Sequence, residues 1–158
     1  MKKYLQQSNH VSLVEKLGYI HRQWRSIIDN ELSPLGLTHP RWTAMWKLWR
    51  MGGDVSQKVL ADALEIELGS LMRTLGQLEA QGLIERHTSP NDKRVRLVIL
   101  THEGRGIIKQ MEARIIQTRT ELLSRITPEE MGVFDSVVER ISENVQQKIQ
   151  AESTETKK

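Results

Sequence analysis

Residues 54–101 constrain the fold of this 158-residue chain more than any other segment. Helical spacing of apolar residues predicts a short helix from Ser56 to Leu64 and, after a tight connection, a second helix from Leu68 to Gln81. Gly82 stands just past the second helix, where glycine commonly ends a helix. The segment therefore begins as two consecutive helices joined by a short turn.

A predicted β-hairpin follows the two helices. Leu83 to His87 and Val95 to Leu100 have the character of strands, and the connecting residues Thr88 to Arg94 are rich in turn formers. The second strand alternates two sets of side chains, Val95, Leu97 and Ile99 in one and Arg96 and Val98 in the other. Helix, turn, helix and hairpin in this order predict a winged helix-turn-helix, whose second helix enters the major groove of DNA.

The second helix has two distinct faces. Its apolar stripe, which we expect to be buried, consists of Leu71, Leu75 and Leu78. Another face carries side chains that can read base edges or hold phosphates: Ser70, Arg73 and Gln77, with Thr74 beside them. Arginine suits bidentate contact with guanine, and glutamine suits adenine. An ordinary amphipathic helix with a solvated polar face fits this spacing equally well, so the prediction of DNA binding depends on the hairpin.

The hairpin is basic. From Arg86 to Arg96, four basic side chains stand against one acid, namely Arg86, Lys93, Arg94 and Arg96 against Asp92. Such side chains can lie over phosphates or enter a narrow minor groove. A charged hairpin tip alone is usually a solubilising feature, but a polar-faced helix and a basic hairpin at this short spacing together favour DNA binding. We expect Asp92 to hold the hairpin in shape by accepting from Arg94 or from turn amides.

Charge along the chain argues slightly against DNA binding. The net charge is +3, and residues 51–105 carry seven Lys and Arg against eight Asp and Glu. The positive charge of the predicted DNA-binding segment is therefore concentrated in the hairpin, so that DNA binding would depend on a focused patch.

The hairpin region resembles a known family. The sequence QLEAQGLIERHTSPNDKRVRLVILTHEG contains LExxGLIxR, a wing built on DxR and a closing LTxxG, and it resembles the winged-helix core of MarR-type bacterial transcriptional regulators. LTHPRWTAMWKL is similar to the LTxxxW segment of the SlyA/RovA subgroup, and LGYIHRQWRSIIDNELSPLGLT looks like that subgroup's first helix and the turn after it. The resemblance spans about residues 10–150.

The resemblance implies a cytoplasmic homodimer that binds a palindromic operator in double-stranded DNA and acts as a repressor, an activator or both. Ser70 and Arg73 match the family's SxxR motif, which contacts DNA. Lys93 and Arg94 match the basic positions of its D(R/K)R wing, although many relatives have arginine where this chain has Lys93.

Apolar stripes predict long helices on both sides of the winged helix. The first, over about residues 10–32, carries Leu13, Leu17, Ile20, Trp24 and Ile27. Thr101 is a good N-cap for a helix from His102 to Ser124, with Ile108, Met111, Ile115, Thr118 and Leu122 in its stripe. Thr127 to Glu130 form a capping box for a last helix that carries Met131, Phe134, Val138, Ile141, Val145 and Ile149. We expect the polar tail from Ala151 to fray.

These flanking helices can pack as a three-helix satellite of one chain or interlock with a second chain. The resemblance favours the homodimer, with an interface formed by Leu13, Leu17, Ile20, Phe134, Val138, Ile141 and Val145. The fold class is then mainly α, an α+β winged helix-turn-helix flanked by N- and C-terminal dimerisation helices. We expect residues 1–36 to contribute to dimerisation, residues 37–101 to form the DNA-binding domain, and residues 102–158 to form the C-terminal dimerisation helices.

Three of the four tryptophans lie on a predicted helix from His39 to Met51, one side of which carries Trp42, Met45, Trp46 and Trp49. Such a cluster is more often a packing face than a ligand site. MarR-type regulators commonly hold an aromatic carboxylate between the dimerisation helices and the winged helix. The resemblance therefore implies aromatic walls from Trp24, Trp42 and Trp46, and a carboxylate partner among Arg22, Arg25 and Arg41. The SlyA/RovA subgroup often has histidine where Arg41 stands, which leaves the ligand's identity open.

Several classes of protein are disfavoured. The chain has no cysteine, and its five histidines lack the spacing of a zinc site, so we expect no metal and no cofactor. It has no phosphate-binding loop or nucleophile motif, which argues against an enzyme. It also lacks an apolar run near 18 residues and a signal-peptide core, so we expect a cytosolic protein without a membrane span.

One alternative stays open, a helical interaction protein that kept the fold but lost DNA binding. Gly69 and Gly76 inside the second helix and Glu67 at its start give it some support, because each glycine weakens a helix interior by up to about 1 kcal/mol.

Overall fold

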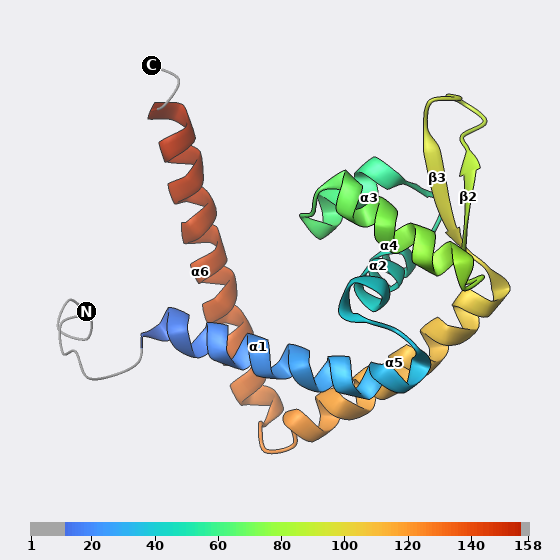
Figure 1. The fold of residues 1–158 in the computed structure, drawn as a ribbon. Helices are drawn as coiled ribbons and strands as arrows, with labels where there is room; N and C mark the ends of the chain where they lie inside the picture. Colours follow the sequence, from blue (N-terminus) through green and yellow to red (C-terminus); the bar gives the residue numbers. More distant parts are fainter. Residues whose placement is uncertain (1–11, 156–158) are drawn as a thin grey trace. The chain divides into compact units, whose positions relative to one another are not determined.

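A computed structural model describes residues 12–155 (Figure 1). The chain divides into two compact units, one ending at Thr118 and the other beginning at Arg119. The elements in chain order are α1 (Leu13–Leu32), the 3-10 helix η2 (Ser33–Leu35), α2 (His39–Arg50), β1 (Val55–Ser56), α3 (Gln57–Leu64), α4 (Leu68–Ala80), β2 (Ile84–Thr88), β3 (Arg96–Leu100), α5 (His102–Leu122) and α6 (Pro128–Glu155). No helix in the described range is both long and apolar enough to span a bilayer.

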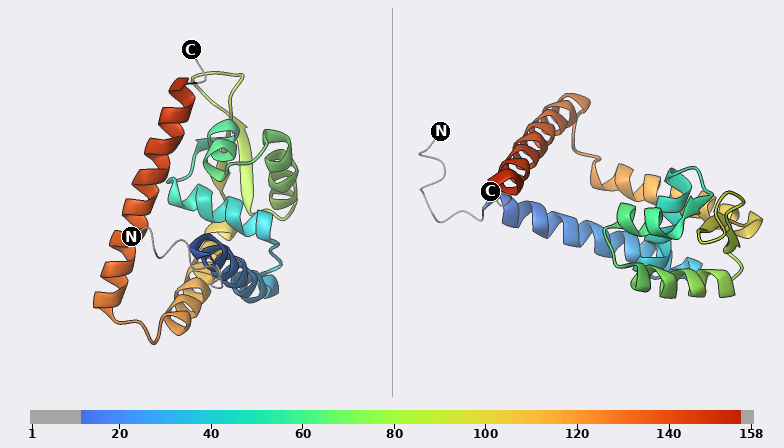
Figure 2. Two further views of the ribbon diagram at one scale, coloured as in Figure 1. Left: turned by 90° about the vertical axis from the view of Figure 1, so that its left-hand side faces the viewer. Right: turned by 90° about the horizontal axis from the view of Figure 1, so that it is seen from above.

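The first unit contains the predicted winged helix. Helices α2, α3 and α4 pack together, and α4 ends at Ala80 with Gly82 in the left-handed region, at a φ of 70°. The hairpin of β2 and β3 projects beyond α3 and α4, so that its tip stands clear of the helices (Figures 1 and 2). This arrangement confirms the mainly helical winged-helix fold with long flanking helices.

The sheet has three strands rather than two. Its order is β1-β3-β2, all pairs are antiparallel, and Val55 of β1 lies opposite Val98 of β3. The sequence did not predict β1, because a strand of two residues is too short to show alternation. Ser56 ends β1 and also caps α3, where its Oγ accepts from the amide of Val59 at 3.2 Å.

The core of the first unit confirms the predicted stripe of α4. Leu71, Leu75 and Leu78 are completely buried. They belong to one apolar cluster with side chains from neighbouring elements, among them Leu60 of α3, Met45 and Leu48 of α2, Ile84 of β2, Val98 and Leu100 of β3, and Ile108 and Met111 of α5. Burial of this continuous cluster is the main source of stability for the helix-turn-helix.

Of the two sets of side chains that alternate along the second strand, the hairpin buries the one that contains Val98. Val98 and Leu100 are buried, whereas Leu97 and Ile99 are only half-buried. The register pairs Ile84 with Leu100 and Arg86 with Val98. Alternate residues share a face of a strand, so Arg86 lies on the core side of the sheet.

Helix α2 also differs in part from its prediction. Ala44, Met45 and Leu48 form its buried face, Trp42 and Trp46 are half-buried, and Trp49 is 42% exposed. The prediction that Trp49 shares a packing face with Met45 was therefore wrong. The helix packs against α3 and α4, and its buried residues Ala44, Met45 and Leu48 belong to the core, whereas Trp49 near its end does not.

The joint between the hairpin and α5 is tight. The Thr101 Oγ1 accepts from the amide of Gly104 at 3.0 Å, which confirms the predicted N-cap, and the Thr101 hydroxyl also donates to the carbonyl of Gly82 at 2.6 Å. A Cβ on Gly104 would lie 2.0 Å from the carbonyl oxygen of Leu83, so only glycine fits there. Ile108, Met111 and Thr118 of α5 are buried as expected, but Leu122 is exposed.

The second unit contains α6. Its predicted capping box is confirmed, because the amide of Thr127 donates to Glu130 at 2.9 Å and the Thr127 hydroxyl accepts from the amide of Glu130 at 3.2 Å. The tail was predicted to fray from Ala151, but α6 continues to Glu155, and residues 156–158 lie outside the described residues. Lys148 pairs with Glu152 at 3.3 Å, an i,i+4 ion pair that favours the helix, and the Ser153 hydroxyl donates to the carbonyl of Ile149.

Candidate nucleic-acid interface and adjacent pocket

Helix α4 presents Ser70, Arg73 and Gln77 to solvent. The described residues contain no acid within ion-pair distance of Arg73, so its guanidinium is available to an external partner. Thr74, which the sequence placed beside this face, is only 8% exposed and its hydroxyl donates to the carbonyl of Ser70 at 3.2 Å. Thr74 follows Leu71 by three residues and precedes Leu78 by four, so it shares their buried side of α4 and does not belong to the exposed set.

Two glycines lie on either side of Arg73. Gly69 precedes it by four residues and Gly76 follows it by three, so both share its side of α4. Apart from the neighbouring residues and the backbone of α4 itself, no atom lies within 4 Å of a Cβ built at either position. The backbone of α4 is therefore uncovered on both sides of the Arg73 side chain.

Arg86 was predicted to contact DNA, but it is held inside the winged helix. Its Nε donates to Oε2 of Glu79 at 3.0 Å and its Nη2 donates to the same oxygen. The hydrogen bond with Arg86 is the main cause that lowers the pKa of Glu79, and the same hydrogen bond raises the pKa of Arg86. Because Arg86 lies on the core side of the sheet, its ion pair with Glu79 ties β2 to α4.

The wing turn between β2 and β3 is organised around Asp92. Its carboxylate accepts from the amide of Arg94 at 2.9 Å, and its carbonyl accepts from the amide of Val95 at 2.9 Å. The guanidinium Nε of Arg94 lies 3.5 Å from the same carboxylate while the side chain remains almost fully exposed. Lys93 and Arg96 are also exposed. The turn thus presents three cations to solvent on a braced backbone.

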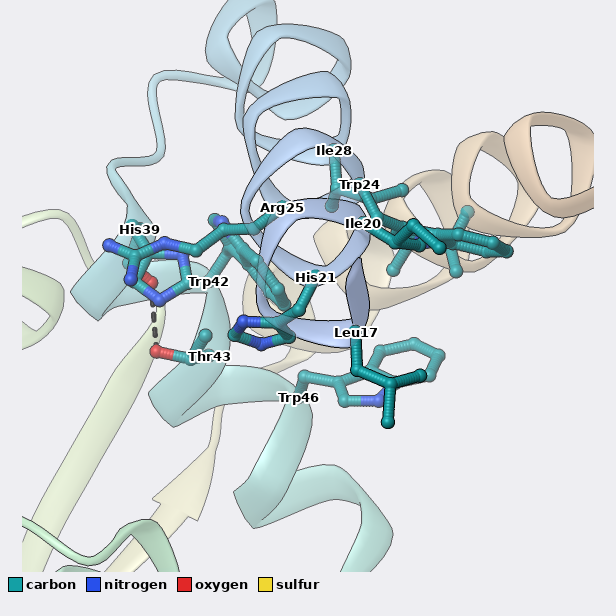
Figure 3. Close-up of a pocket in the computed structure, with 11 residues that line it drawn as sticks. Leu17, Ile20, His21, Trp24, Arg25, Ile28, His39, Trp42, Thr43 and Trp46 are labelled. Atoms are coloured by element: carbon teal, nitrogen blue, oxygen red, sulfur yellow. Dashed lines mark hydrogen bonds between the residues drawn. The ribbon is translucent and has the colours of Figure 1, made fainter. Parts of the chain in front are cut away.

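A pocket with a volume of about 700 Å³ lies between α1 and α2 (Figure 3), and Ile115 of α5 also lines it. Its walls are mostly aromatic and aliphatic, and its polar lining comes from His21, Arg25, His39 and Thr43. The apolar lining residues are Leu17, Ile20, Trp24, Ile28, Trp42 and Trp46. A concave apolar site with a few polar groups is typical of small-molecule binding.

Asp29 holds one edge of this pocket together. Its Oδ1 accepts from the indole Nε1 of Trp42 at 2.7 Å and lies 2.9 Å from Nδ1 of His39, and its Oδ2 lies 3.7 Å from Nε of Arg25. Burial raises the pKa of Asp29, but the hydrogen bonds from Trp42 and His39 and the nearby positive charges outweigh burial and lower it. The rings of His39 and Trp42 also meet edge to face, with centroids 5.0 Å apart.

The structure brings four of the six predicted ligand residues together, Trp24, Arg25, Trp42 and Trp46. Arg22 lies outside the pocket, beside Glu15 and Tyr19 on another side of α1, and the Nε of Arg41 donates to the hydroxyl of Thr38 at 3.1 Å. Sequence reasoning missed His21, His39, Thr43 and the bracing Asp29. The spacing of His21 and Arg25, four residues apart and flanking Trp24, was the available signal for the first of these.

Comparison with known proteins places the fold in a family. Residues 37–95 match the model of the MarR family. The transcriptional regulator PA3341 is 31% identical over 86% of this chain and 99% of its own, with a TM-score of 0.77. MarR from E. coli in its apo form is 26% identical over 85% of this chain and 98% of its own, with a TM-score of 0.73.

A mutant of MarR from E. coli complexed with operator DNA is also similar, with 26% identity over 82% of this chain and 92% of its own and a TM-score of 0.73. These relatives cover both the winged helix and the long flanking helices. The chain belongs to the MarR family of transcriptional regulators, which are not enzymes.

Proposed function

We propose that this protein is a homodimer that binds a palindromic operator and regulates transcription in the cytoplasm. The observation that carries the proposal is Arg73, which is exposed on α4 and has no ion-pair partner among the described residues. Ser70 and Gln77 lie on the same face, and the wing of the same winged helix presents further cations. Arginine on a recognition helix can form two hydrogen bonds with a guanine. The similarity to a MarR mutant complexed with operator DNA supports the same mode of binding.

Exposed apolar stripes support the homodimer. Leu13, Leu17 and Ile20 of α1 are exposed, and so are Phe134, Val138, Ile141 and Val145 of α6. Large exposed apolar surfaces on a soluble protein usually mark an interaction site. We assign residues 37–101 to DNA binding, and residues 1–36 and 102–158 to dimerisation. In a symmetric dimer the two copies of α4 would enter successive major grooves about 34 Å apart.

We place the chain in the SlyA/RovA subgroup because of the LTxxxW segment at residues 37–42 and the similarity of its first helix. Whether it represses or activates a gene depends on the position of the operator in the promoter.

The pocket supports a small aromatic carboxylate as effector. Trp24, Trp42 and Trp46 offer flat apolar walls, and Arg25 lies at the edge where a carboxylate would bind. Such a ligand would alter DNA binding only if it binds more tightly to one separation of the two recognition helices than to another. The same Arg25 lies near Asp29, so the ligand would compete with an internal carboxylate.

Selection of duplexes from a random library tests the DNA-binding function. We expect enrichment of a palindrome whose half-sites are about one helical turn apart, and an affinity that falls steeply as salt rises. Arg73→Ala should cost about 1 to 3 kcal/mol on the selected duplex and much less on a random duplex. The exposed Arg125, far from α4 in sequence, provides a matched control as Arg125→Ala.

Two results would contradict the proposal in different ways. An equal loss of affinity for both duplexes would indicate that Arg73 contacts a phosphate and not a base. No enrichment of any duplex at low salt would favour the alternative, an interaction protein that has kept the fold but lost DNA binding.

A further inference from the structure

We propose that Asp54 positions the wing through an ion pair with His87, and that this pair tightens DNA binding as the pH falls through the range in which histidine gains its charge. This inference rests on the proposed DNA-binding function and adds a form of regulation to it. The Nε2 atom of His87 on β2 lies 3.2 Å from Oδ1 of Asp54, the residue immediately before β1. Neither residue was among the site residues predicted from the sequence.

The turn that carries Asp54 has an unusual backbone. Gly52, Gly53 and Asp54 have φ values of 86°, 75° and 51°, so three consecutive residues lie in the left-handed region. Residues other than glycine seldom adopt that region, and aspartate and asparagine are among those that tolerate it best. Val55, the next residue, pairs with Val98 of β3. The turn and the sheet together therefore fix the backbone that presents the Asp54 carboxylate.

His87 and its neighbour Arg86 attach β2 on its two opposite faces. Successive side chains of a strand point to opposite sides of the sheet. Arg86 lies on the core side, where it pairs with Glu79 of α4, and His87 therefore lies on the outer side, where it pairs with Asp54. Since β3 lies between β1 and β2, the outer pair crosses over β3. Strand β2 is thus held to the recognition helix on one face and to the turn before β1 on the other.

Only one of these two pairs changes its charge near neutral pH. Arginine and glutamate both stay charged between about pH 5 and pH 8, whereas histidine ordinarily gains its proton near about pH 6.5. In mild acid both pairs are therefore ion pairs. In mild alkali the ring of His87 is neutral, and the pair between His87 and Asp54 is no longer an ion pair.

Acids and cations both lie around His87. The acids of the outer face are Asp54, before β1, and Glu85, on β2 itself, whereas β3 contributes apolar side chains to that face. Cations from the start of α3 and from the wing lie towards the tip of the hairpin: Lys58, Lys93, Arg94 and Arg96. Among the described residues, Asp54 alone lies within ion-pair distance of His87. The pair with Asp54 is therefore the direct contact that a proton on His87 strengthens.

The place of His87 on β2 connects the pair to DNA binding. His87 is the last residue but one of β2, so the pair acts next to the turn that carries Lys93 and Arg94. A wing held in one orientation loses less freedom when its cations meet DNA. Exposed ion pairs are weak, so we expect the affinity for DNA to rise by only about twofold to fivefold from about pH 8 to about pH 5.5.

The test measures affinity for the selected duplex at about pH 5.5 and about pH 8, at one ionic strength, and compares the ratio of the two affinities between variants. The ratio for His87→Gln gives the contribution of all other titrating groups. The wild-type ratio should exceed it by about twofold to fivefold. Asp54→Asn keeps a residue that tolerates the left-handed backbone, and its ratio should fall to that of His87→Gln. Glu85→Gln removes the other acid of the outer face and should keep the wild-type ratio. Urea denaturation at both pH values checks that each variant is folded.

Asp54→Asn separates positioning from a simple attraction between a charged His87 and DNA. Such an attraction needs no Asp54, so a ratio in Asp54→Asn as large as that of the wild type would overturn the proposal. Equal ratios for the wild type and His87→Gln would also overturn it, while tight binding at both pH values would leave the proposed function intact. A wild-type protein that binds no duplex at either pH would reject the proposed function and this inference with it.

A combined variant tests whether the pair acts through the wing. Once Lys93 and Arg94 are both replaced by alanine, adding His87→Gln should leave the ratio unchanged, because the cations that the pair positions are absent. A further fall in the ratio would show that His87 acts on DNA binding by another route and would overturn the proposed role of Asp54.

Discussion

Glu79 of α4 accepts two hydrogen bonds from Arg86 of β2, so one ion pair links the recognition helix to the wing. Both side chains remain partly accessible to solvent, which limits the energy of the pair. The pair matters mainly for geometry, because it fixes β2 relative to α4, and both elements must contact DNA in the proposed function.

Glu79→Gln should destabilise the protein by about 1 kcal/mol at neutral pH, measured by urea denaturation. The folded protein lowers the pKa of Glu79, so the pair's contribution is complete above the ordinary glutamate value of about 4.3 and is lost as pH falls through the folded value. The difference between variant and wild type should therefore disappear in acid. Glu85→Gln removes a charge from the exposed side of β2 and is the control. A difference that persists unchanged at low pH would contradict an electrostatic origin.

Replacing Lys93 and Arg94 together by alanine should weaken binding to specific and random duplexes alike. Each phosphate contact contributes about 0.9 to the salt slope, so the slope should fall by up to about 1.8. Filter binding or fluorescence anisotropy at four salt concentrations measures it. An unchanged slope would show that the wing tip does not touch DNA in solution.

Val138→Asp combined with Ile141→Asp places two charges in the exposed apolar stripe of α6. We expect sedimentation as a monomer and loss of specific DNA binding in the same variant, because one half-site alone is held weakly. Ser142→Asp, on a polar part of α6, should do neither. A double variant that still sediments as a dimer would exclude this stripe as the main interface.

Asp29→Asn should tighten the binding of salicylate by about 1 kcal/mol, because Arg25 is released from a competing carboxylate. Tryptophan fluorescence can report the titration, since Trp24, Trp42 and Trp46 line the pocket. Salicylamide, which is neutral, is the matched control ligand, and its affinity should be the same for Asp29→Asn and for the wild-type protein. Equal gains for the acid and the amide would indicate a looser pocket rather than an unpaired Arg25.

The winged helix was predictable because its periodic features are local. Leu71, Leu75 and Leu78 repeat with helical spacing, and Gly82 and Thr101 mark helix boundaries by their own chemistry. The sequence could not predict features that depend on a distant partner. Arg86 looked like any basic residue of the hairpin until the register placed it on the core side beside Glu79.

The pocket also depends on contacts between helices that the sequence alone does not reveal. Its three tryptophans were visible as aromatic residues on two helices, but their common cavity depends on how α1 meets α2. His39 and Asp29 come together from separate helices across the turn of η2, and spacing within one helix cannot predict such a pair. The choice among the three candidate arginines likewise required the helices' relative orientation, which favours Arg25.

The joint at the base of the wing determines how the first unit can move. The Thr101 hydroxyl donates to the carbonyl of Gly82, and the Thr101 amide donates to the carbonyl of Leu83. Gly104 packs so closely against the carbonyl of Leu83 that a side chain on residue 104 would not fit. We therefore expect this joint to be rigid and not to act as a hinge. A torque applied to the early turns of α5 would turn the hairpin with it, and the Glu79–Arg86 pair would pass that rotation to α4.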